Sequence, residues 1–479
     1  MSGPKTILIG ADWREGEEEP FSSISPVDGR VVAELATAST ADVDAAVTTA
    51  RAAFEASEWQ EMRPHQRAAL LHRFADLIDA AGEEIARAQS DDNGKTMAEC
   101  RSQAVAAVGI MRYFASLCET VQGHVTPQRA ESLTLSLHEP YGVVAAITPW
   151  NSPITLEAQK IAPAIAAGNA VVLKPSEVTP QVALIYGRLG LEAGFPPGIL
   201  NIVTGAGGTG RALVDHPGVD LISFTGGTAA GRAIAEAAGR RLCPVLLELG
   251  GKSPNMIFAD ADLEAAANGA AQGIFGSGGQ SCVAGSRIFV ERSVYDRVVD
   301  AVVERAADWR LGWPDDAEAR IGPMASFAHR ESVAAAVDRA RAEGAEVRCG
   351  GGAPDTEPLS KGAFYLPTVL TGLSNAAHTA QQEIFGPVAV VIPFEDEADL
   401  IAQANDTPFG LAAGVWTKDA SKAWRVAQAV RAGTFWINGY KEGSISTPFG
   451  GFGQSGIGRE KGVAGLRAYS QTKGVFWKL

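Results

Sequence analysis

The sequence predicts an α/β protein of more than one domain, and three observations carry this expectation. Short apolar segments alternate with helical segments from residue 142 to about 250. A second alternating stretch runs from about 286 to 439. Strands that alternate with helices form parallel sheets with right-handed crossovers. At 479 residues the chain is also too long for one hydrophobic core and long enough for two or three domains.

The elements follow in order along the chain. Residues 41–120 are Ala-rich, with the apolar spacing of amphipathic helices. Five short strands are then expected at 142–148, 170–174, 200–204, 221–225 and 245–249. Helices are expected between them at 154–168, near 180–193, near 210–216 and near 228–238. Ligands bind such sheets at the carboxyl ends of the strands, so chemistry-bearing motifs at those ends are informative.

Two polar alternating segments lie outside both stretches, at 132–140 and 467–479. Neither has an adjacent helix to cover it, so both are expected to be exposed edge strands, which invite pairing with another subunit. A capped surface hairpin is the alternative, and composition does not separate the two.

Charge and composition exclude several function classes. The net charge of −14 argues against nucleic acid and anionic membranes as partners. No apolar run approaches the roughly 20 residues that a membrane span requires. Residues 15–20 are Glu-rich, unlike a targeting segment, so a cytoplasmic location is expected. The five cysteines form no CxxC pair and the seven histidines no HExxH motif, so neither a disulfide framework nor a metal site is expected.

Two glycine-rich turns are candidates for a phosphate site. Residues 205–210 fit the pattern GxGxxG, but the acidic residue required about 20 positions later is missing, so an ordinary turn is favoured. The turn Thr225-Gly226-Gly227 also follows a strand and opens a helix that contains Gly231. Free backbone N–H groups at a helix N-terminus bind a pyrophosphate, so this second turn is the better candidate.

A second polar group, Lys174, Ser176 and Glu177, ends another expected strand. A lysine at this position donates to ribose hydroxyls, and a nearby carboxylate accepts from a 2′-hydroxyl and repels a 2′-phosphate. The alternative is an ordinary loop that leads into a helix.

Cys282 is the candidate nucleophile, and Glu248 is the candidate general base. The small residues around Cys282 leave its sulfur accessible, although a lone cysteine is more often an inert buried residue, so composition gives this role no more than an even chance. Glu248 ends a strand among apolar residues, where burial raises the pKa of a carboxyl group toward the range of a general base. A salt bridge between Glu248 and Lys252 is the structural alternative.

Taken together, these residues resemble the aldehyde dehydrogenase superfamily over nearly the whole chain, in order and spacing. The motifs are Pro149-Trp150-Asn151, Glu-Leu-Gly-Gly-Lys at 248–252, Gly-Gln-x-Cys at 279–282, Glu-Ile-Phe-Gly-Pro at 383–387, Pro-Phe-Gly-Gly-Phe at 448–452 and Ser-Gly-x-Gly-Arg-Glu at 455–460. The separation of base and nucleophile, 282 − 248 = 34 residues, is the one that the family has. Any one motif could arise by chance, but all of them in register could hardly do so.

The resemblance implies a catalytic role for five residues. Cys282 would attack an aldehyde, and the side-chain amide of Asn151 would complete the oxyanion hole with the Cys282 backbone N–H. Glu248 would activate the water that hydrolyses the resulting thioester. Lys160 and Glu460 match a buried pair thought to pass protons.

The resemblance also implies a cofactor and a substrate pocket. NAD, rather than NADP, would contact Trp150, Lys174, Ser176, Glu177, Thr225, Gly226, Gly227, Gly231, Leu249, Glu383 and Phe385. The aldehyde would contact Ser152, Gln159, Ser281, Val283 and Tyr440.

Five positions differ from the common family pattern or add charge near the site. Gly227 replaces a common Ser, and His329 replaces a common Gln near the nicotinamide ribose. Ser152 and Gln159 replace Phe and Trp, which predicts a more polar and roomier aldehyde tunnel than in fatty-aldehyde enzymes and disfavours an aromatic box for quaternary ammonium substrates. Lys441 either attracts an anionic aldehyde or, as we expect, is solvated.

By resemblance, the fold would combine a Rossmann-like parallel-sheet cofactor domain, a second α/β catalytic domain and a small β oligomerisation element. The ranges are 1–120 with 141–250 for NAD binding, 251–445 for catalysis, and 121–140 with 465–479 for oligomerisation into a homodimer or homotetramer. Relatives that transfer the acyl group to coenzyme A typically lack the base glutamate, so Glu248 favours hydrolysis. A non-catalytic protein of this fold would be free to lose Cys282, Asn151 or Glu248, and all three are present.

Overall fold

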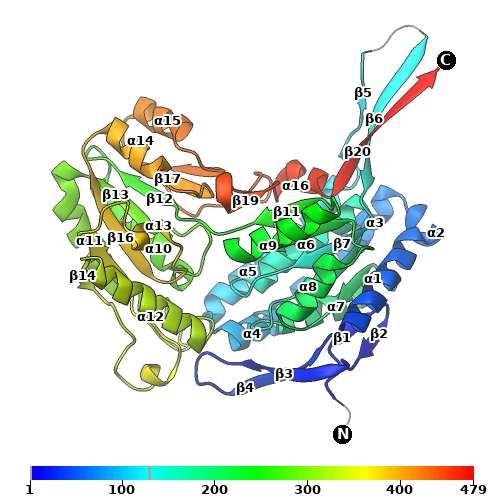
Figure 1. Cartoon of the computed structure of the whole chain (residues 1–479), viewed down its shortest axis with the longest axis horizontal. Coiled ribbons are helices and arrows are strands. Elements are labelled where there is room, and N and C mark those ends of the chain that lie inside the picture. The colour runs from blue at the N-terminus through cyan, green and yellow to red at the C-terminus, as the bar shows by residue number, and fades with distance from the viewer. Residues whose placement is uncertain (1–2, 128–130) are drawn as a thin grey trace.

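The computed structural model of the chain describes residues 3–127 and 131–479. Two α/β bodies lie side by side, and a narrow antiparallel arm projects from one of them (Figure 1). The α/β fold class predicted from the sequence is confirmed, with a mainly parallel sheet in each body and a small β element in the arm.

The first body is built on an eight-stranded sheet in the order β19-β11-β10-β7-β8-β9-β1-β2. Its parallel centre comprises β7 (Val143–Ile147), β8 (Ala170–Lys174), β9 (Leu200–Ile202), β10 (Leu221–Thr225) and β11 (Val245–Glu248). Its antiparallel edges are β1 (Ile7–Ile9) with β2 (Asp12–Arg14) on one side and β19 (Gly456–Ile457) on the other. The five central strands were expected from the sequence, and each lies within two residues of its expected bounds. The edge strands were not expected.

Helices cover both faces of this sheet. Those early in the chain are α1 (Thr40–Glu55), α2 (Ser57–Gln60), α3 (Pro64–Ala80), α4 (Gly82–Asn93) and α5 (Met97–Leu117). Those between the strands are α6 (Pro153–Ala167), α7 (Gln181–Glu192), α8 (Gly207–Asp215) and α9 (Thr228–Arg240). The chain runs from β7 outward to β8 and β9, and then returns to the other side of β7 for β10 and β11. The strand order therefore reverses between β7 and β10, which is where an open α/β sheet forms its ligand crevice.

The second body holds a seven-stranded sheet in the order β14-β15-β16-β13-β12-β17-β18. Its strands are β12 (Pro254–Ile257), β13 (Arg287–Glu291), β14 (Glu346–Cys349), β15 (Thr368–Thr371), β16 (Val388–Phe394), β17 (Ala412–Trp416) and β18 (Thr434–Ile437). Its helices are α10 (Leu263–Phe275), α11 (Tyr295–Ala307), α12 (Phe327–Ala342), α13 (His378–Gln381), α14 (Glu397–Asn405) and α15 (Ala420–Ala429). Only β14 runs antiparallel to its neighbour. After β18 the chain returns to the first body through β19 and α16 (Gly462–Ala468).

The arm is a three-stranded antiparallel sheet in the order β20-β6-β5. Its strands are β5 (His124–Val125), β6 (Ser132–Pro140) and β20 (Ser470–Lys478). The expectation that 132–140 is an edge strand was wrong, because β6 is central and pairs with β20 along its whole length. The other expected edge strand, within 467–479, does lie at an edge as β20. Residues 128–130 of the expected oligomerisation segment 121–140 lie outside the described residues.

A separate two-stranded hairpin, β3 (Glu18–Ile24) and β4 (Val31–Thr37), reaches from the first body toward the second (Figure 1). It joins the second body through a hydrogen bond from the Ala363 N–H to the carbonyl of Pro26 at its turn, with N···O 2.7 Å. None of the described helices has the length and apolar character needed to cross a membrane.

Candidate active site

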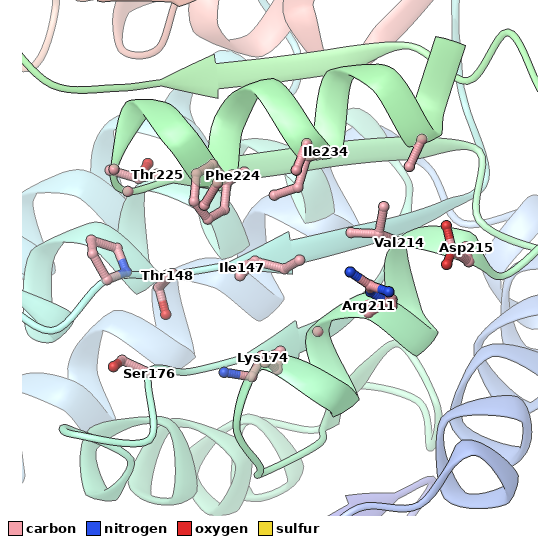
Figure 2. Close-up of a pocket in the computed structure, with 18 of the residues that line it drawn as sticks. Ile147, Thr148, Lys174, Ser176, Arg211, Val214, Asp215, Phe224, Thr225 and Ile234 are labelled. Carbon is pink, nitrogen blue, oxygen red and sulfur yellow. The ribbon is translucent and has the colours of Figure 1, made fainter. Parts of the chain in front are cut away.

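A crevice opens at the carboxyl ends of β7, β8 and β10 (Figure 2). The register of the strands places Ile147 beside both Lys174 and Phe224, so three strand ends lie at the same level. Figure 2 shows Phe224 and Thr225 on one wall of the crevice and Lys174 and Ser176 on the opposite wall. The cavity has a volume of about 590 Å³. Its position at the reversal of strand order is the one expected for a dinucleotide.

The turn after β10 provides the features that a phosphate group requires. Gly227 is the N-cap of α9, and a Cβ added there would meet nothing within 4 Å, so the approach to the helix N-terminus is open. Free N–H groups and the helix dipole favour an anion at such an end. Three buried threonine hydroxyls around the turn have no hydrogen-bond partner among the described residues, those of Thr148, Thr225 and Thr228. Unpaired buried hydroxyls of this kind fit a polar ligand in the crevice.

The lysine and the glutamate on the opposite wall lie close to each other. The Lys174 ammonium is 3.5 Å from a carboxylate oxygen of Glu177, and both side chains line the crevice. Burial lowers the pKa of Lys174, and the neighbouring Glu177 opposes this shift. The Ser176 hydroxyl accepts from the Val178 N–H at 3.2 Å, which shapes the turn between them.

Gly231 requires a correction, since it does not line the crevice. A Cβ at Gly231 would lie 2.3 Å from Cδ2 of Leu249, so this glycine allows α9 to pack closely on the chain after β11. The turn at 205–210 was predicted to be an ordinary turn, but part of it lies at the crevice. Gly207 and Gly210 line the crevice, while the Thr209 hydroxyl is used for a 2.9 Å bond to the carbonyl of Ala38.

A second cavity, of about 400 Å³, continues from the crevice between the two bodies. The cavities share Pro149, Trp150 and the turn 225–227. The second one is also lined by Cys282, Glu248 and Asn151. The candidate nucleophile, base and oxyanion donor therefore lie together in the cavity that continues from the crevice. The predicted wall residues Ser152, Gln159, Ser281 and Val283 line the same cavity, as do Leu249, Glu383 and Phe385.

The loop that carries Cys282 is fixed in a conformation that few residues can adopt. After α10, residues Ser277, Gly278 and Gly279 all have positive φ, at 62°, 61° and 69°. A Cβ at Gly279 would lie 2.0 Å from the carbonyl oxygen of Gly386, so only glycine fits there. The Asn151 amide then donates to the carbonyl of Gln280 at 3.0 Å. This bond ties the loop after β7 to the nucleophile loop.

Burial and nearby charges around Cys282 favour the neutral thiol. Burial, together with the carboxylates of Glu383 and Glu248, raises the pKa of the Cys282 thiol from 9.0 to about 12. The charges of Lys461 and Lys441 act in the opposite direction. Reactivity of this cysteine therefore depends on the positive charge that reaches the cavity.

Glu248, the candidate base, is buried at the end of β11. One of its carboxylate oxygens has no hydrogen-bond partner in the described parts of the chain. Burial first, and the neighbouring Glu460 second, raise its pKa well above the usual value. The alternative of a salt bridge to Lys252 was wrong, because the Lys252 ammonium is itself buried without a hydrogen-bond partner and its pKa falls to about 7.

Comparison with known proteins agrees with this geometry. The aldehyde dehydrogenase family model matches residues 13–475. The chain belongs to the aldehyde dehydrogenase family. An aldehyde dehydrogenase of Emericella nidulans is 41% identical over 99% of this chain and 95% of its own length. The NAD⁺ complex of a Bacillus cereus aldehyde dehydrogenase superposes with a TM-score of 0.97, at 40% identity over 100% of this chain and 97% of that one.

A third relative has a modified cysteine in its structure. Betaine aldehyde dehydrogenase of Staphylococcus aureus, in complex with NAD⁺ and with a BME-modified cysteine, has a TM-score of 0.97 at 38% identity, over 99% of this chain and 98% of that one. The chain is thus an aldehyde dehydrogenase, an oxidoreductase that acts on the aldehyde group.

An aromatic cluster around Trp150 lies at the junction of the two cavities in this aldehyde dehydrogenase. The Trp150 ring lies 4.9 Å from the His329 ring and 5.2 Å from the Phe385 ring, between centroids. His329 is bonded to the carbonyl of Phe385 at 2.8 Å, and burial lowers its pKa. Beside the cluster, Glu383 accepts from the Gly251 N–H at 3.0 Å, which fixes this carboxylate at the cavity wall.

Lys160 and Glu460 form a fully buried ion pair in this aldehyde dehydrogenase. The Lys160 ammonium is 2.8 Å from the Glu460 carboxylate and donates to the Ser223 hydroxyl at 3.0 Å. Ser223 in turn is 2.8 Å from the hydroxyl of Tyr469. Neither of these last two residues was predicted from the sequence, although a serine in an otherwise apolar strand was the available signal. The chain of bonds links β10, α6 and the C-terminal segment behind the catalytic cavity.

Replacing Lys160 by methionine is expected to lower the free energy of unfolding by about 3–5 kcal/mol, because it leaves the buried Glu460 without its partner. The measurement is urea unfolding of purified protein. Lys473→Met is a matched control, because it removes a solvent-exposed pair with Glu139 on the arm and should cost less than about 1 kcal/mol. Equal losses for the two variants would contradict the expectation.

Two substrate-side predictions need correction. Tyr440 does not line the cavity, because its ring packs into the second body against Gly273, Gly285 and Gly414. Lys441 is not solvated: its ammonium donates to the carbonyl of Gly276 at 3.1 Å, at the C-terminal end of α10, and burial lowers its pKa to about 8.

A further buried cluster supports the nucleophile loop and was not predicted. Lys95, Glu99 and Ser277 bond to one another, with the Lys95 ammonium 2.5 Å from the Ser277 hydroxyl. Gln103 links Glu99 to the cavity residue Ser152, with 3.3 Å to each. The spacing of Lys95 and Glu99 at i and i+4 was the only sequence signal, and it is typical of an ordinary surface pair.

Proposed function

We propose that this aldehyde dehydrogenase uses NAD to oxidise an aldehyde to its carboxylic acid, through a thiohemiacetal and then a thioester on Cys282, with Glu248 assisting hydrolysis. The observation that carries the proposal is that the cofactor crevice opens into a cavity lined by both Cys282 and Glu248. A nucleophile and a base that share one cavity suit acyl transfer to water.

The residues have distinct tasks in the proposed reaction. The Cys282 sulfur forms a bond to the aldehyde carbon, and the carbonyl oxygen becomes an oxyanion. One N–H of the Asn151 amide is used on the Gln280 carbonyl, so its second N–H remains for the oxyanion, together with the Cys282 backbone N–H. When bound, NAD accepts the hydride that leaves the thiohemiacetal carbon. Glu248 then takes a proton from the water that attacks the thioester, and the bond to the Cys282 sulfur breaks.

NADH formation by the pure protein tests this proposal across aliphatic, aromatic, amino and carboxylated aldehydes. Turnover with NAD and without coenzyme A supports hydrolysis. If NADH forms only after coenzyme A is added, the result would contradict the role of Glu248 in hydrolysis. Ser152 and Gln159 make the tunnel wall polar, so compact polar aldehydes should be preferred over fatty aldehydes, and a selective preference for betaine aldehyde would contradict this reading of the wall.

Glu177 is proposed to select NAD over NADP, because its carboxylate in the crevice would repel a 2′-phosphate. The variant Glu177→Gln is expected to raise kcat/KM for NADP relative to NAD roughly tenfold. Steady-state kinetics with each cofactor at a fixed aldehyde concentration provides the ratio. Glu192→Gln, at the end of α7 and outside the crevice, is the control. An unchanged ratio in Glu177→Gln would place the selectivity elsewhere.

The arm is proposed to join subunits into a homodimer or a dimer of dimers. The outer edge of β20 has no strand partner among the described residues, and Phe476 and Trp477 on it are 85% and 61% exposed. An open strand edge with exposed aromatic residues suits pairing with a second copy of the chain.

A further inference from the structure

Lys461 is a half-buried cation at the wall of the catalytic cavity, and the proposed mechanism gives it no role. Its side chain lines the cavity together with Cys282, Glu248 and Phe449. The ammonium lies 4.9 Å from the centroid of the Phe449 ring, a distance typical of a cation–π contact. It makes no hydrogen bond or ion pair within residues 3–127 and 131–479, the part that the structure describes. Apart from this ring contact, the charge has no fixed partner, and it lies at the cavity wall.

The backbone holds Lys461 in a conformation that is essentially confined to glycine. Its φ and ψ are 59° and 167°. The preceding residue, Glu460, is fixed by two backbone hydrogen bonds with Phe449, each 2.7 Å long. On the other side, the Gly465 N–H donates to the Lys461 carbonyl at 2.7 Å. A long side chain kept at such a position, where glycine would be unstrained, points to a task for that side chain.

The other cations around the cavity are already committed. Lys160 is paired with Glu460, and Lys441 is bonded to the Gly276 carbonyl. The cavity wall itself carries the carboxylates of Glu248, Glu383 and Glu460. A thiolate that forms among these carboxylates requires a positive charge nearby.

We propose that the Lys461 ammonium is the positive charge that stabilises the Cys282 thiolate in the catalytic cavity. The inference rests on the proposed function, in which Cys282 is the nucleophile. Lys461 acts here as a positioning residue, since it acts through the sulfur and forms no bond to the substrate.

The charged groups around the pair give the expected pH dependence. Cys282 faces the carboxylates of Glu383 and Glu248 and the ammonium groups of Lys461 and Lys441. Lys461 faces Glu460, Cys282 and Glu248, and burial lowers its pKa. Because the lysine is charged only below its pKa, its support of the thiolate is present at lower pH and is lost as pH rises through that lowered pKa.

The test is the rate at which iodoacetamide alkylates Cys282 in the full-length protein, followed by peptide mass spectrometry from about pH 6 to about pH 10. Alkylation joins the Cys282 sulfur to the acetamide carbon with loss of iodide, and only the thiolate reacts. In Lys461→Met the fraction of thiolate at a given pH should fall, so the alkylation rate at neutral pH should be roughly tenfold lower or more. Lys461→Arg should restore the rate, and Lys461→Gln provides a second neutral variant. The exposed lysine variant Lys418→Met should not change the profile.

The outcomes separate this proposal from its alternatives. An unchanged alkylation profile in both neutral variants overturns the proposal. If those variants also raise KM only for carboxylated aldehydes, the cation binds an anionic substrate instead. Alkylation requires neither aldehyde nor NAD, so a failure of the wild-type protein to oxidise aldehydes would contradict the proposed function without touching this result.

Discussion

Replacing Cys282 by alanine is expected to abolish aldehyde oxidation, with kcat at least about 10⁴-fold lower than in the wild-type protein. No other described cysteine lines the cavity, so no second sulfur can take its place. The measurement is NADH formation at saturating aldehyde and NAD. Binding of NAD should remain, because the cofactor crevice is lined without Cys282. This binding can be followed by the quenching of protein fluorescence.

Cys349→Ala is the matched control, because this half-buried cysteine lies in β14, at the far edge of the second sheet. The Cys349→Ala variant should keep full activity. Thiol reagents should still inactivate it, because Cys282 is unchanged. Residual turnover in Cys282→Ala above about one per cent of the wild-type rate would exclude a covalent route through this sulfur.

The fold could be predicted where local pattern and tertiary environment agree. The central strands β7, β8 and β10 are buried along their whole lengths, so a mainly apolar run marked each of them. The edge hairpin β1–β2 could not be found this way, since β2 is largely exposed and each strand has only three residues. Pairing of β6 with β20 joins segments more than 300 residues apart, and alternation alone cannot name a partner.

Those residues of the candidate site that lie at or just after the ends of core elements could be predicted from the sequence. Cys282, Glu248 and Asn151 share one cavity because each ends or follows a core element. The direction in which a side chain points could not be predicted from the sequence. Lys441 turns inward from a backbone φ of 62°, and Lys461 from one of 59°, and neither angle is encoded by a lysine. The bonds of Ser277 to Lys95 and Glu99 join separate elements and were hidden for the same reason.

Replacing Glu248 by glutamine is expected to separate the two halves of the reaction. The amide keeps the shape of the side chain but cannot accept a proton from water, so the thioester on Cys282 should accumulate. Rapid mixing should show a burst of NADH close to one per active site, followed by a steady rate lower by about 10²- to 10⁴-fold. Mass spectrometry of the quenched protein should find the acyl group on Cys282.

The raised pKa of Glu248 also predicts how the hydrolysis rate changes with pH. Burial and the neighbouring Glu460 raise the pKa of Glu248, and a general base works only when it is deprotonated. The hydrolysis rate of the wild-type protein should therefore rise with pH through that raised pKa, and the rise should be absent in Glu248→Gln. Glu192→Gln, at the end of α7 and outside the crevice, changes charge by the same amount and should keep the wild-type profile. A variant without burst and without acyl-enzyme would instead place Glu248 before the thioester, as the base that activates Cys282.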